Sequence, residues 1–179
     1  MGQTDTSPAQ VLVGLYSSQE LVATSIPVDG TPDTPYRVSR VVVPCLPGDV
    51  LDVTAEVRVT NDLSYTVGVG SRLRYYDCDD GLPYPHGTWI EIPTPTGDNV
   101  TPITSAYAGR HHMPITLTRV YRVPETWPVP FTEGDYIGPH RMAINLMVDA
   151  HWGNYHSGDR LKVDPYGQQL VVRRWSVPS

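Results

Sequence analysis

Hydrophobic and polar residues alternate in two long runs of the chain. In the first run, from Leu51 to Thr60, every second residue is apolar and the intervening residues are polar or charged. The second run, from Met142 to His151, shows a similar alternation. A period of two is typical of a β-strand with one face in the core and the other in water. Each run therefore predicts one strand whose register is fixed by its apolar face.

Shorter segments rich in β-branched and aromatic residues predict further strands around these two runs. No segment has the 3.6-residue periodicity of an amphipathic helix. Near residue 165 the sequence predicts a hairpin, in which Asp164–Gly167 form a type I turn with Pro second and Gly fourth. The further predicted strands are residues 11–16, 21–26, 36–43, 65–76, 89–92, 113–123, 161–163 and 170–175.

Glycine and proline are frequent, with 15 Gly and 18 Pro among 179 residues, and they lie mainly between the predicted strands. Both residues interrupt helices and form turns. We therefore predict an all-β fold, an antiparallel β-sandwich of the jelly-roll type with long Pro/Gly-rich loops. Residues 1–16 are expected to form an N-terminal arm and first strand, and residues 17–179 a single jelly-roll domain.

The charge composition narrows the classes of function. The formal net charge is −6, and the 13 basic residues include a single lysine, Lys162. A net negative charge disfavours nucleic-acid binding. The first residues lack the basic and apolar regions of a signal peptide, and no apolar run could span a membrane, so neither secretion nor a membrane partner is expected. Cys45 and Cys78 lack a metal-binding spacing and are expected to be reduced thiols.

Motifs for catalysis are missing from the sequence. It contains no phosphate-binding loop, no serine-hydrolase elbow and no His-Glu-x-x-His motif, so we expect no enzymatic activity, no catalytic residue and no cofactor. The acidic segment Asp77–Gly81 is one residue too short for an EF-hand calcium loop and lacks its distal glutamate. We interpret it as a solvated turn, with a non-standard calcium site as the alternative.

Two groups of side chains are candidates for ligand contacts. His111 and His112 are adjacent, so in a strand they point to opposite faces and cannot share one metal ion within a single copy. Local hydrogen bonding is the simpler expectation; the alternative is a metal held on a threefold axis by one histidine from each copy. Trp152 and Tyr155 lie close to histidine and asparagine residues, a combination suited to sugar rings, unless the loop is simply packed by its own aromatic side chains.

Arginine and aromatic residues within predicted strands indicate an assembly surface. The planar guanidinium group of arginine is favoured in protein interfaces. Polar strand faces that carry such residues suit subunit contacts better than solvent, so we expect self-association. The candidate aromatic contacts are Tyr75, Tyr76, Tyr121 and Trp175, and the arginines are Arg72, Arg74, Arg119, Arg122, Arg173 and Arg174.

Several segments resemble virion accessory proteins of bacteriophages that infect actinobacteria, and more broadly the jelly-roll group of trimeric capsid and tumour-necrosis-factor-like domains. They are VVVPCLPGDVLDVTAEVRVTNDLSYTVGVGSRLRYY at Val41–Tyr76, GDNVTP at Gly97–Pro102, RHHMP at Arg110–Pro114 and SGDRLKVDPYGQQLVVRRW at Ser157–Trp175.

The resemblance implies a structural role in a virion, as a capsid decoration or minor tail protein made in the host cytoplasm. The protein would form a homotrimer on the particle surface and contact the major capsid or tail proteins, with its N-terminal arm as a brace. The alternative is a carbohydrate-binding module, the receptor-binding part of a tail tip or fibre, with a host surface glycan as its ligand. In either case nucleic acid and membrane are not expected partners.

Overall fold

The regular structure of the chain is entirely β-strand in the residues that the computed structural model describes, which confirms the predicted all-β class. These residues are 9–19, 24–28, 36–79, 90–92, 100–105, 112–128, 131–133, 136–152 and 158–176. None of them belongs to a helix long and apolar enough to cross a membrane. The strands are β1 (Val11–Gln19), β2 (Thr24–Pro27), β3 (Tyr36–Pro44), β4 (Val50–Thr60), β5 (Val67–Asp77), β6 (Ile90–Glu91), β7 (Val100–Ile103), β8 (His112–Arg122), β9 (Phe131–Glu133), β10 (Tyr136–Gly138), β11 (Arg141–Trp152) and β12 (Arg160–Ser176).

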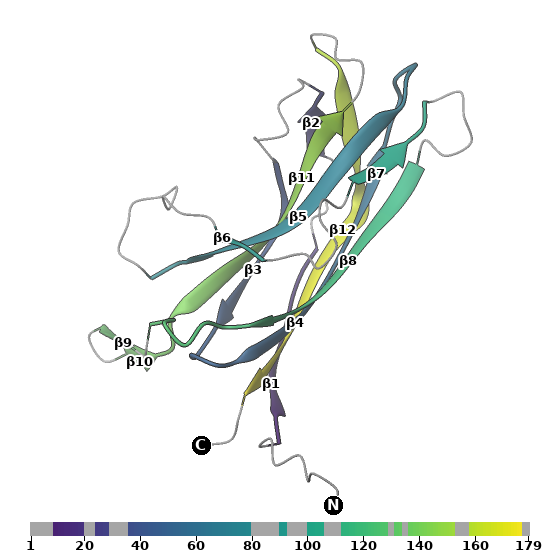
Figure 1. Cartoon of the computed structure of the whole chain (residues 1–179). Coiled ribbons are helices and arrows are strands. Elements are labelled where there is room, and N and C mark those ends of the chain that lie inside the picture. Colours follow the sequence, from purple (N-terminus) through teal and green to yellow (C-terminus); the bar gives the residue numbers. More distant parts are fainter. Residues whose placement is uncertain are drawn as a thin grey trace, which may run out of the picture.

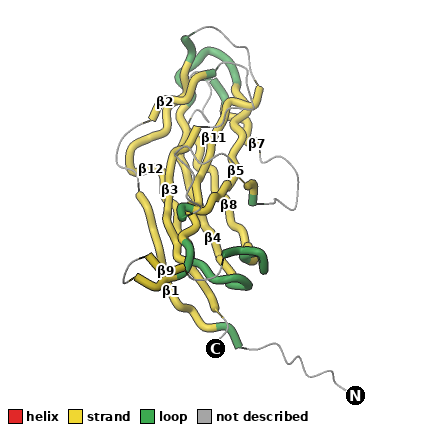
Figure 2. The backbone as a smooth tube through the Cα atoms, turned by 90° about the vertical axis from the view of Figure 1, so that its left-hand side faces the viewer, coloured by secondary structure: helices red, strands yellow, loops and turns green. Residues whose placement is uncertain are grey.

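Two antiparallel sheets form a sandwich (Figure 1). In sheet I the strand order is β1–β12–β4–β8, and β2 pairs with one end of β12. In sheet II the order is β3–β11–β5–β6, and β7 pairs with β5. β9 and β10 form a small separate hairpin. Figure 2 shows that the long strands of both sheets run along the same long axis of the molecule.

The order in which the chain visits the two sheets is that of a jelly roll. With the short strands β2, β9 and β10 set aside, the chain passes from β1 in sheet I to β3 in sheet II, back to β4 and again to β5. The hairpin from β5 to β6 and β7 stays within sheet II, and β8, β11 and β12 then resume the alternation. Because most connections cross between the sheets, the chain wraps around one shared core. The predicted jelly-roll sandwich is confirmed.

The core lies between the sheets and follows the predicted alternation in β4. Leu51, Val53 and Val59 are fully buried, whereas Glu56 and Arg58 on the other face are exposed. Sheet II contributes its own apolar residues to the same cluster, among them Leu73 and Leu146. Burial of this apolar surface is the main stabilising contribution to the sandwich.

β11 departs from the predicted pattern, because both of its faces are buried. Leu146 and Val148 point into the core as expected, but Asn145 and Asp149 on the opposite face are only 0% and 1% exposed. β11 is a central strand between β3 and β5. On its outer face, Asn145 lies between Arg40 of β3 and Arg74 of β5, which have long side chains. A strand with an alternating sequence is therefore covered on both sides.

The predicted C-terminal hairpin is wrong. Residues 160–176 form one strand, β12, and both of its halves pair antiparallel with β4. Val163 pairs with Val59 and Gln168 with Val57, so residues 164–167 are an insertion opposite a single residue of β4. Proline and glycine are tolerated at such a β-bulge. Leu161 and Val163 before the bulge and Leu170 and Val172 after it are all buried, so the continuous strand supplies apolar residues to the core on both sides of the bulge.

The first strand is an edge of the sandwich and continues past the predicted boundary at residue 16. β1 pairs with β12 along Val11–Gln19, with a β-bulge between Leu12 and Gly14. At its far end Ser18 accepts a hydrogen bond from Ser39 of β3, which links the two sheets. Residues 1–8, most of the expected arm, lie outside the described residues.

Candidate interaction surfaces

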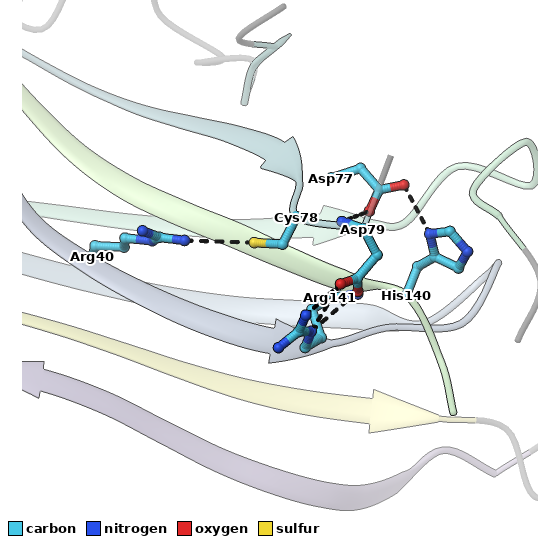
Figure 3. A network of polar contacts seen from close by, with 6 residues as sticks. All are labelled: Arg40, Asp77, Cys78, Asp79, His140 and Arg141. Carbon is cyan, nitrogen blue, oxygen red and sulfur yellow. Dashed lines mark hydrogen bonds and ion pairs between the residues drawn. The ribbon is translucent and has the colours of Figure 1, made fainter. Parts of the chain in front are cut away.

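A network of polar contacts joins the end of β5 to the start of β11, as Figure 3 shows. The Nδ1 atom of His140 lies 3.0 Å from Oδ2 of Asp77. The carboxylate of Asp79 accepts hydrogen bonds from the backbone N–H of Arg141 at 2.7 Å and from its guanidinium group at 3.0 Å. The N–H of Cys78 donates to the carbonyl oxygen of Arg141. These contacts fasten the two strands together at this end of sheet II.

The same network contains three residues whose side-chain atoms could reach one metal ion. Atoms of Asp77, Asp79 and His140 lie within 4.8 Å of one another. However, both carboxylates already accept hydrogen bonds, and the Arg141 guanidinium places a positive charge beside them. Burial alone would raise the pKa of Asp79, but the hydrogen bonds and charge of Arg141 hold that pKa below its ordinary value. The geometry therefore fits a structural clamp better than a cation site.

The two cysteines are free, as the sequence predicts. Burial raises the pKa of Cys45 to about 12, so this thiol is protonated at neutral pH. Cys78 is half-buried, and burial raises its pKa as well, although a hydrogen bond from Arg40 at 3.6 Å opposes that effect. Neither thiol has the lowered pKa that a nucleophilic cysteine requires.

The outer face of sheet I presents apolar side chains to solvent. In β4, Leu51 and Val53 point into the core, so Val50, Asp52 and Thr54 point outward, together with their partners in the neighbouring strands. We call the apolar members of this surface the apolar face. They are Leu12 and Leu15 of β1, Val171 and Trp175 of β12, Val50 of β4 and Val120 of β8.

The exposure of the apolar face is greatest at the two edges of the sheet. Leu15 on β1 is 66% exposed and Val120 on β8 is 74% exposed. Both belong to one register row, in which Arg173 and Asp52 form an ion pair at 3.4 Å between them. Among the described residues, most of the exposed large hydrophobic side chains lie on these two edge strands. Large apolar side chains exposed at both edges of one sheet favour an interaction surface there.

The outer face of sheet II has a different character, because arginines flank its central strand. Leu73 and Tyr75 of β5 point into the core, so Arg72 and Arg74 point outward. On the other side of β11, Arg40 pairs in register with Asn145, and Arg37 with Met147. We call Arg37, Arg40, Arg72 and Arg74 the arginine face.

Three arginines of this face, Arg40, Arg72 and Arg74, differ in how far carboxylates neutralise them. Arg72 forms an ion pair with the buried Asp149 at 3.2 Å, and Gly70 provides the space for that carboxylate. Arg74 lies 4.0 Å from the exposed carboxylate of Glu91. Arg40 lies over the ring of Tyr76, with its Cζ atom 5.4 Å from the ring centroid. On a protein of net charge −6, this face is therefore a local concentration of positive charge.

The predicted placement of Tyr75 and Tyr121 on polar strand faces needs correction. Tyr75 is 3% exposed and belongs to the core, and the hydroxyl group of Tyr121 donates a hydrogen bond to its oxygen at 2.7 Å. The two rings lie 5.2 Å apart between centroids, and Trp127 packs against Tyr75. Burial and the bond to Tyr75 raise the pKa of Tyr121. This pair joins β5 of sheet II to β8 of sheet I instead of forming an outer surface.

The remaining candidate aromatics and histidines lie apart from one another. Tyr76 is 2% exposed beneath Arg40, and Trp175 is half-buried on the apolar face. The Thr60 hydroxyl donates its one hydrogen atom to Asp164 at 2.7 Å. Towards His112 it can therefore only accept, so Nδ1 of His112, 2.6 Å away, is assigned as the donor. This is the local hydrogen bonding expected for His112.

Three candidate residues lie outside what the structure describes. His111 and Tyr155 are not among the described residues, and Trp152 is described only as the last residue of β11, without its side chain. The proposed sugar-binding cluster and the histidine pair thus stay predictions.

The arginines predicted to form one assembly surface are divided among three locations. Arg72 and Arg74 lie on the arginine face, whereas Arg122 and Arg173 lie on the outer face of sheet I. Arg119 and Arg174 alternate with these and lie on the core side of sheet I. There, at one end of the sandwich, Arg174 donates to the buried Asp49 at 2.6 Å.

Sequence reasoning missed Arg37 and Arg40 because they are three residues apart, a spacing that puts side chains on opposite faces of a regular strand. A register shift in β3 opposite Leu146 and Met147 brings both to the same face. Sequence reasoning also missed Leu15 and Val120, because their exposure depends on their positions at the sheet edges.

Comparison with known proteins yields likenesses of fold alone. No protein-family model and no curated protein sequence matches the chain. Among solved structures, it is similar to the Eiger TNF of S. frugiperda, with 11% identity over 92% of this chain and 94% of that one and a TM-score of 0.39. It is similar also to a protein of infectious bursal disease virus, Gx strain, with 9% identity and a TM-score of 0.43.

The similarity to the viral protein covers 100% of this chain but only 41% of the viral one. A third similar structure is the CBM22-1–GH10 part of a Clostridium thermocellum endo-1,4-beta-D-xylanase, with 12% identity and a TM-score of 0.35. It covers 93% of this chain and 27% of the xylanase chain. The chain thus spans less than half of the viral and xylanase chains and nearly all of the Eiger TNF chain.

Proposed function

We propose that this protein is a non-enzymatic structural component of a bacteriophage virion, a capsid decoration or minor tail protein that assembles on the particle surface. The observation that carries the proposal is the apolar face of sheet I, with Leu15 and Val120 exposed at opposite edges. A rigid sheet that displays apolar side chains in water is stabilised when a partner covers them. The virion location is proposed from the resemblance of the sequence to actinobacteriophage accessory proteins.

The position of the apolar residues favours contacts between copies of this chain. β1 and β8 are the two edges of sheet I, and both carry exposed apolar side chains. A contact between the β8 edge of one copy and the β1 edge of the next is heterologous, and such contacts can close into a ring. We propose a ring of three copies, a homotrimer, as the assembled form. Covering the edges also removes the unpaired strand groups that promote aggregation.

Binding to particles tests the virion assignment directly. Purified protein is mixed with particles of the encoding virus that lack it, and the particles are sedimented. We expect saturable co-sedimentation, followed by ordered density on the capsid or tail in electron cryomicroscopy. A protein with a native circular dichroism spectrum that stays in the supernatant at tens of micromolar would contradict the assignment, whatever its oligomeric state.

A further inference from the structure

The arginine face has the geometry and charge of a docking surface for a second kind of partner. We propose that it binds an extended acidic segment of a partner protein, with carboxylates at alternate positions. This binding is separate from the self-association proposed for sheet I, because the two outer faces lie on opposite sides of the sandwich.

The spacing of the arginines matches an extended acidic peptide. Arg40 and Arg74 pair with Asn145 from opposite sides, so their Cα atoms lie about two strand spacings apart, roughly 10 Å. Arg37 and Arg72 flank Met147 in the same way, about 7 Å further along the sheet. In an extended peptide, side chains two residues apart lie on one side at that same distance. A carboxylate above Asn145 would therefore lie between Arg40 and Arg74, and the next one along the peptide would lie beside Arg72.

Carboxylates already occupy part of this surface within the chain itself. Glu91 of β6 pairs in register with Arg74 and brings its carboxylate to 4.0 Å. Asp149 of β11 binds Arg72 at 3.2 Å. An exposed ion pair as long as that of Arg74 contributes little stability, so a partner carboxylate can replace it. The guanidinium group also binds carboxylates through two parallel hydrogen bonds, which the present contact of Arg74 does not provide.

Arg40 has a hydrogen-bond donor that is not used within the chain. Its Nε atom is buried without a hydrogen-bond partner, so it gains an acceptor when the side chain turns outward to a partner carboxylate. The net charge of −6 favours a short acidic segment over a long phosphate polymer, which it would repel more strongly.

Arg40 can be recruited at small cost because its present contacts are weak. Its Nη2 atom donates to the sulfur of Cys78 at 3.6 Å, and thiol sulfur is a weak acceptor. Its guanidinium group lies over the ring of the buried Tyr76, and Arg40 itself is half-buried. A carboxylate ligand would replace both contacts with charge-assisted hydrogen bonds.

Fluorescence anisotropy with defined probes tests the proposal. The probes are a labelled peptide of four Glu-Thr repeats, its Gln-Thr counterpart and a labelled oligothymidylate of equal length. The site variant is Arg40→Gln with Arg74→Gln, and the matched control is Arg58→Gln with Arg160→Gln, which removes two exposed arginines outside the arginine face. Circular dichroism melting establishes that each variant is folded.

We expect the Glu-Thr peptide to bind the wild type and the control variant with equal affinity, and the site variant at least tenfold more weakly. The Gln-Thr peptide should not bind. Three outcomes would overturn the proposal: no binding of the Glu-Thr peptide to the folded wild type at millimolar concentration, an equal loss in the control variant, or tighter binding of oligothymidylate with the same dependence on Arg40 and Arg74. The last outcome would assign the face to a phosphate polymer. None of these results depends on whether the protein self-associates.

Discussion

The outer faces of the two sheets are built by the same alternation of strands but have opposite chemistry. On sheet I, a register row runs from Leu15 to Val120 and contains an Arg173–Asp52 ion pair between them, so its charge is internally balanced. On sheet II, arginines flank a central strand, and one of them, Arg40, lies over the ring of Tyr76 and not beside a carboxylate.

This difference indicates two modes of association. The apolar face gains free energy when any complementary apolar surface excludes water, and another copy of the chain offers such a surface. The arginine face gains free energy only from an anionic partner, and the gain weakens as salt rises. One sandwich can therefore assemble with itself through one side and dock a different protein through the other.

The largest stability effect is expected from Gly70→Ala, which changes the arginine face alone. A Cβ atom at this position would lie 2.1 Å from Oδ1 of Asp149, so that buried carboxylate must shift away from Arg72. We expect a loss of about 2 kcal/mol in the free energy of unfolding, measured by urea denaturation. In an Asp149→Ala background the same substitution should cost much less, since the clash is gone. An equal loss of unfolding free energy in both backgrounds would show that the clash with Asp149 is not the cause.

A smaller effect is expected from Arg141→Gln, which breaks the clamp at the end of sheet II. Arg141 lowers the pKa of Asp79 below its ordinary 3.8, so the ion pair stabilises the folded state fully above that pH. Because the guanidinium group is largely exposed, we expect a loss of about 0.5–1 kcal/mol at pH 7. The difference from wild type should shrink below pH 3.8, as Asp79 becomes protonated. Urea titrations at several pH values measure the unfolding free energies of both proteins. A difference between them that grows towards acid pH would contradict this account.

The smallest effect concerns the contact between Arg40 and Cys78. Burial raises the pKa of this thiol and Arg40 lowers it, so Arg40→Gln should raise the pKa further. The rate of iodoacetamide labelling of Cys78 at pH 8 should fall severalfold, and its pH profile should move to higher pH. Mass spectrometry of the labelled peptide distinguishes Cys78 from the buried Cys45. An unchanged pH profile of labelling would mean that Arg40 does not contact the Cys78 thiol in solution.

The sequence predicts those parts of the fold that depend on local alternation. The run at Leu51–Thr60 corresponds to β4 (Val50–Thr60), and the run at Met142–His151 to β11. Pro165 and Gly167 suggested a reversal because a turn and a β-bulge use the same residues. The difference between a turn and a bulge depends on whether residues 168–175 pair again with β4. That pairing joins segments far apart in the sequence, so a local pattern does not predict it.

The candidate surfaces were less predictable, for two physical reasons. Which of two adjacent residues faces the core depends on register, so Tyr75 is buried in the interior while Tyr76 lies under an arginine on the outer face. Whether an outward residue is exposed depends on strand order, because Val120 on an edge strand is 74% exposed and Asn145 on a central one is 0% exposed. Two adjacent tyrosines carry no apolar–polar alternation that would fix which of them faces the core, and strand order depends on contacts between segments far apart in the sequence.

Sedimentation velocity tests the central claim, assembly through the apolar face, most directly. Wild-type protein at tens of micromolar should sediment as a species of three times 19.8 kDa, and Leu15→Arg with Val120→Arg should sediment as a folded monomer. The control variant Arg40→Gln with Arg74→Gln, altered only on sheet II, should retain the wild-type mass. A wild-type monomer at this concentration, or an oligomer that persists in the Leu15/Val120 variant, would contradict the account.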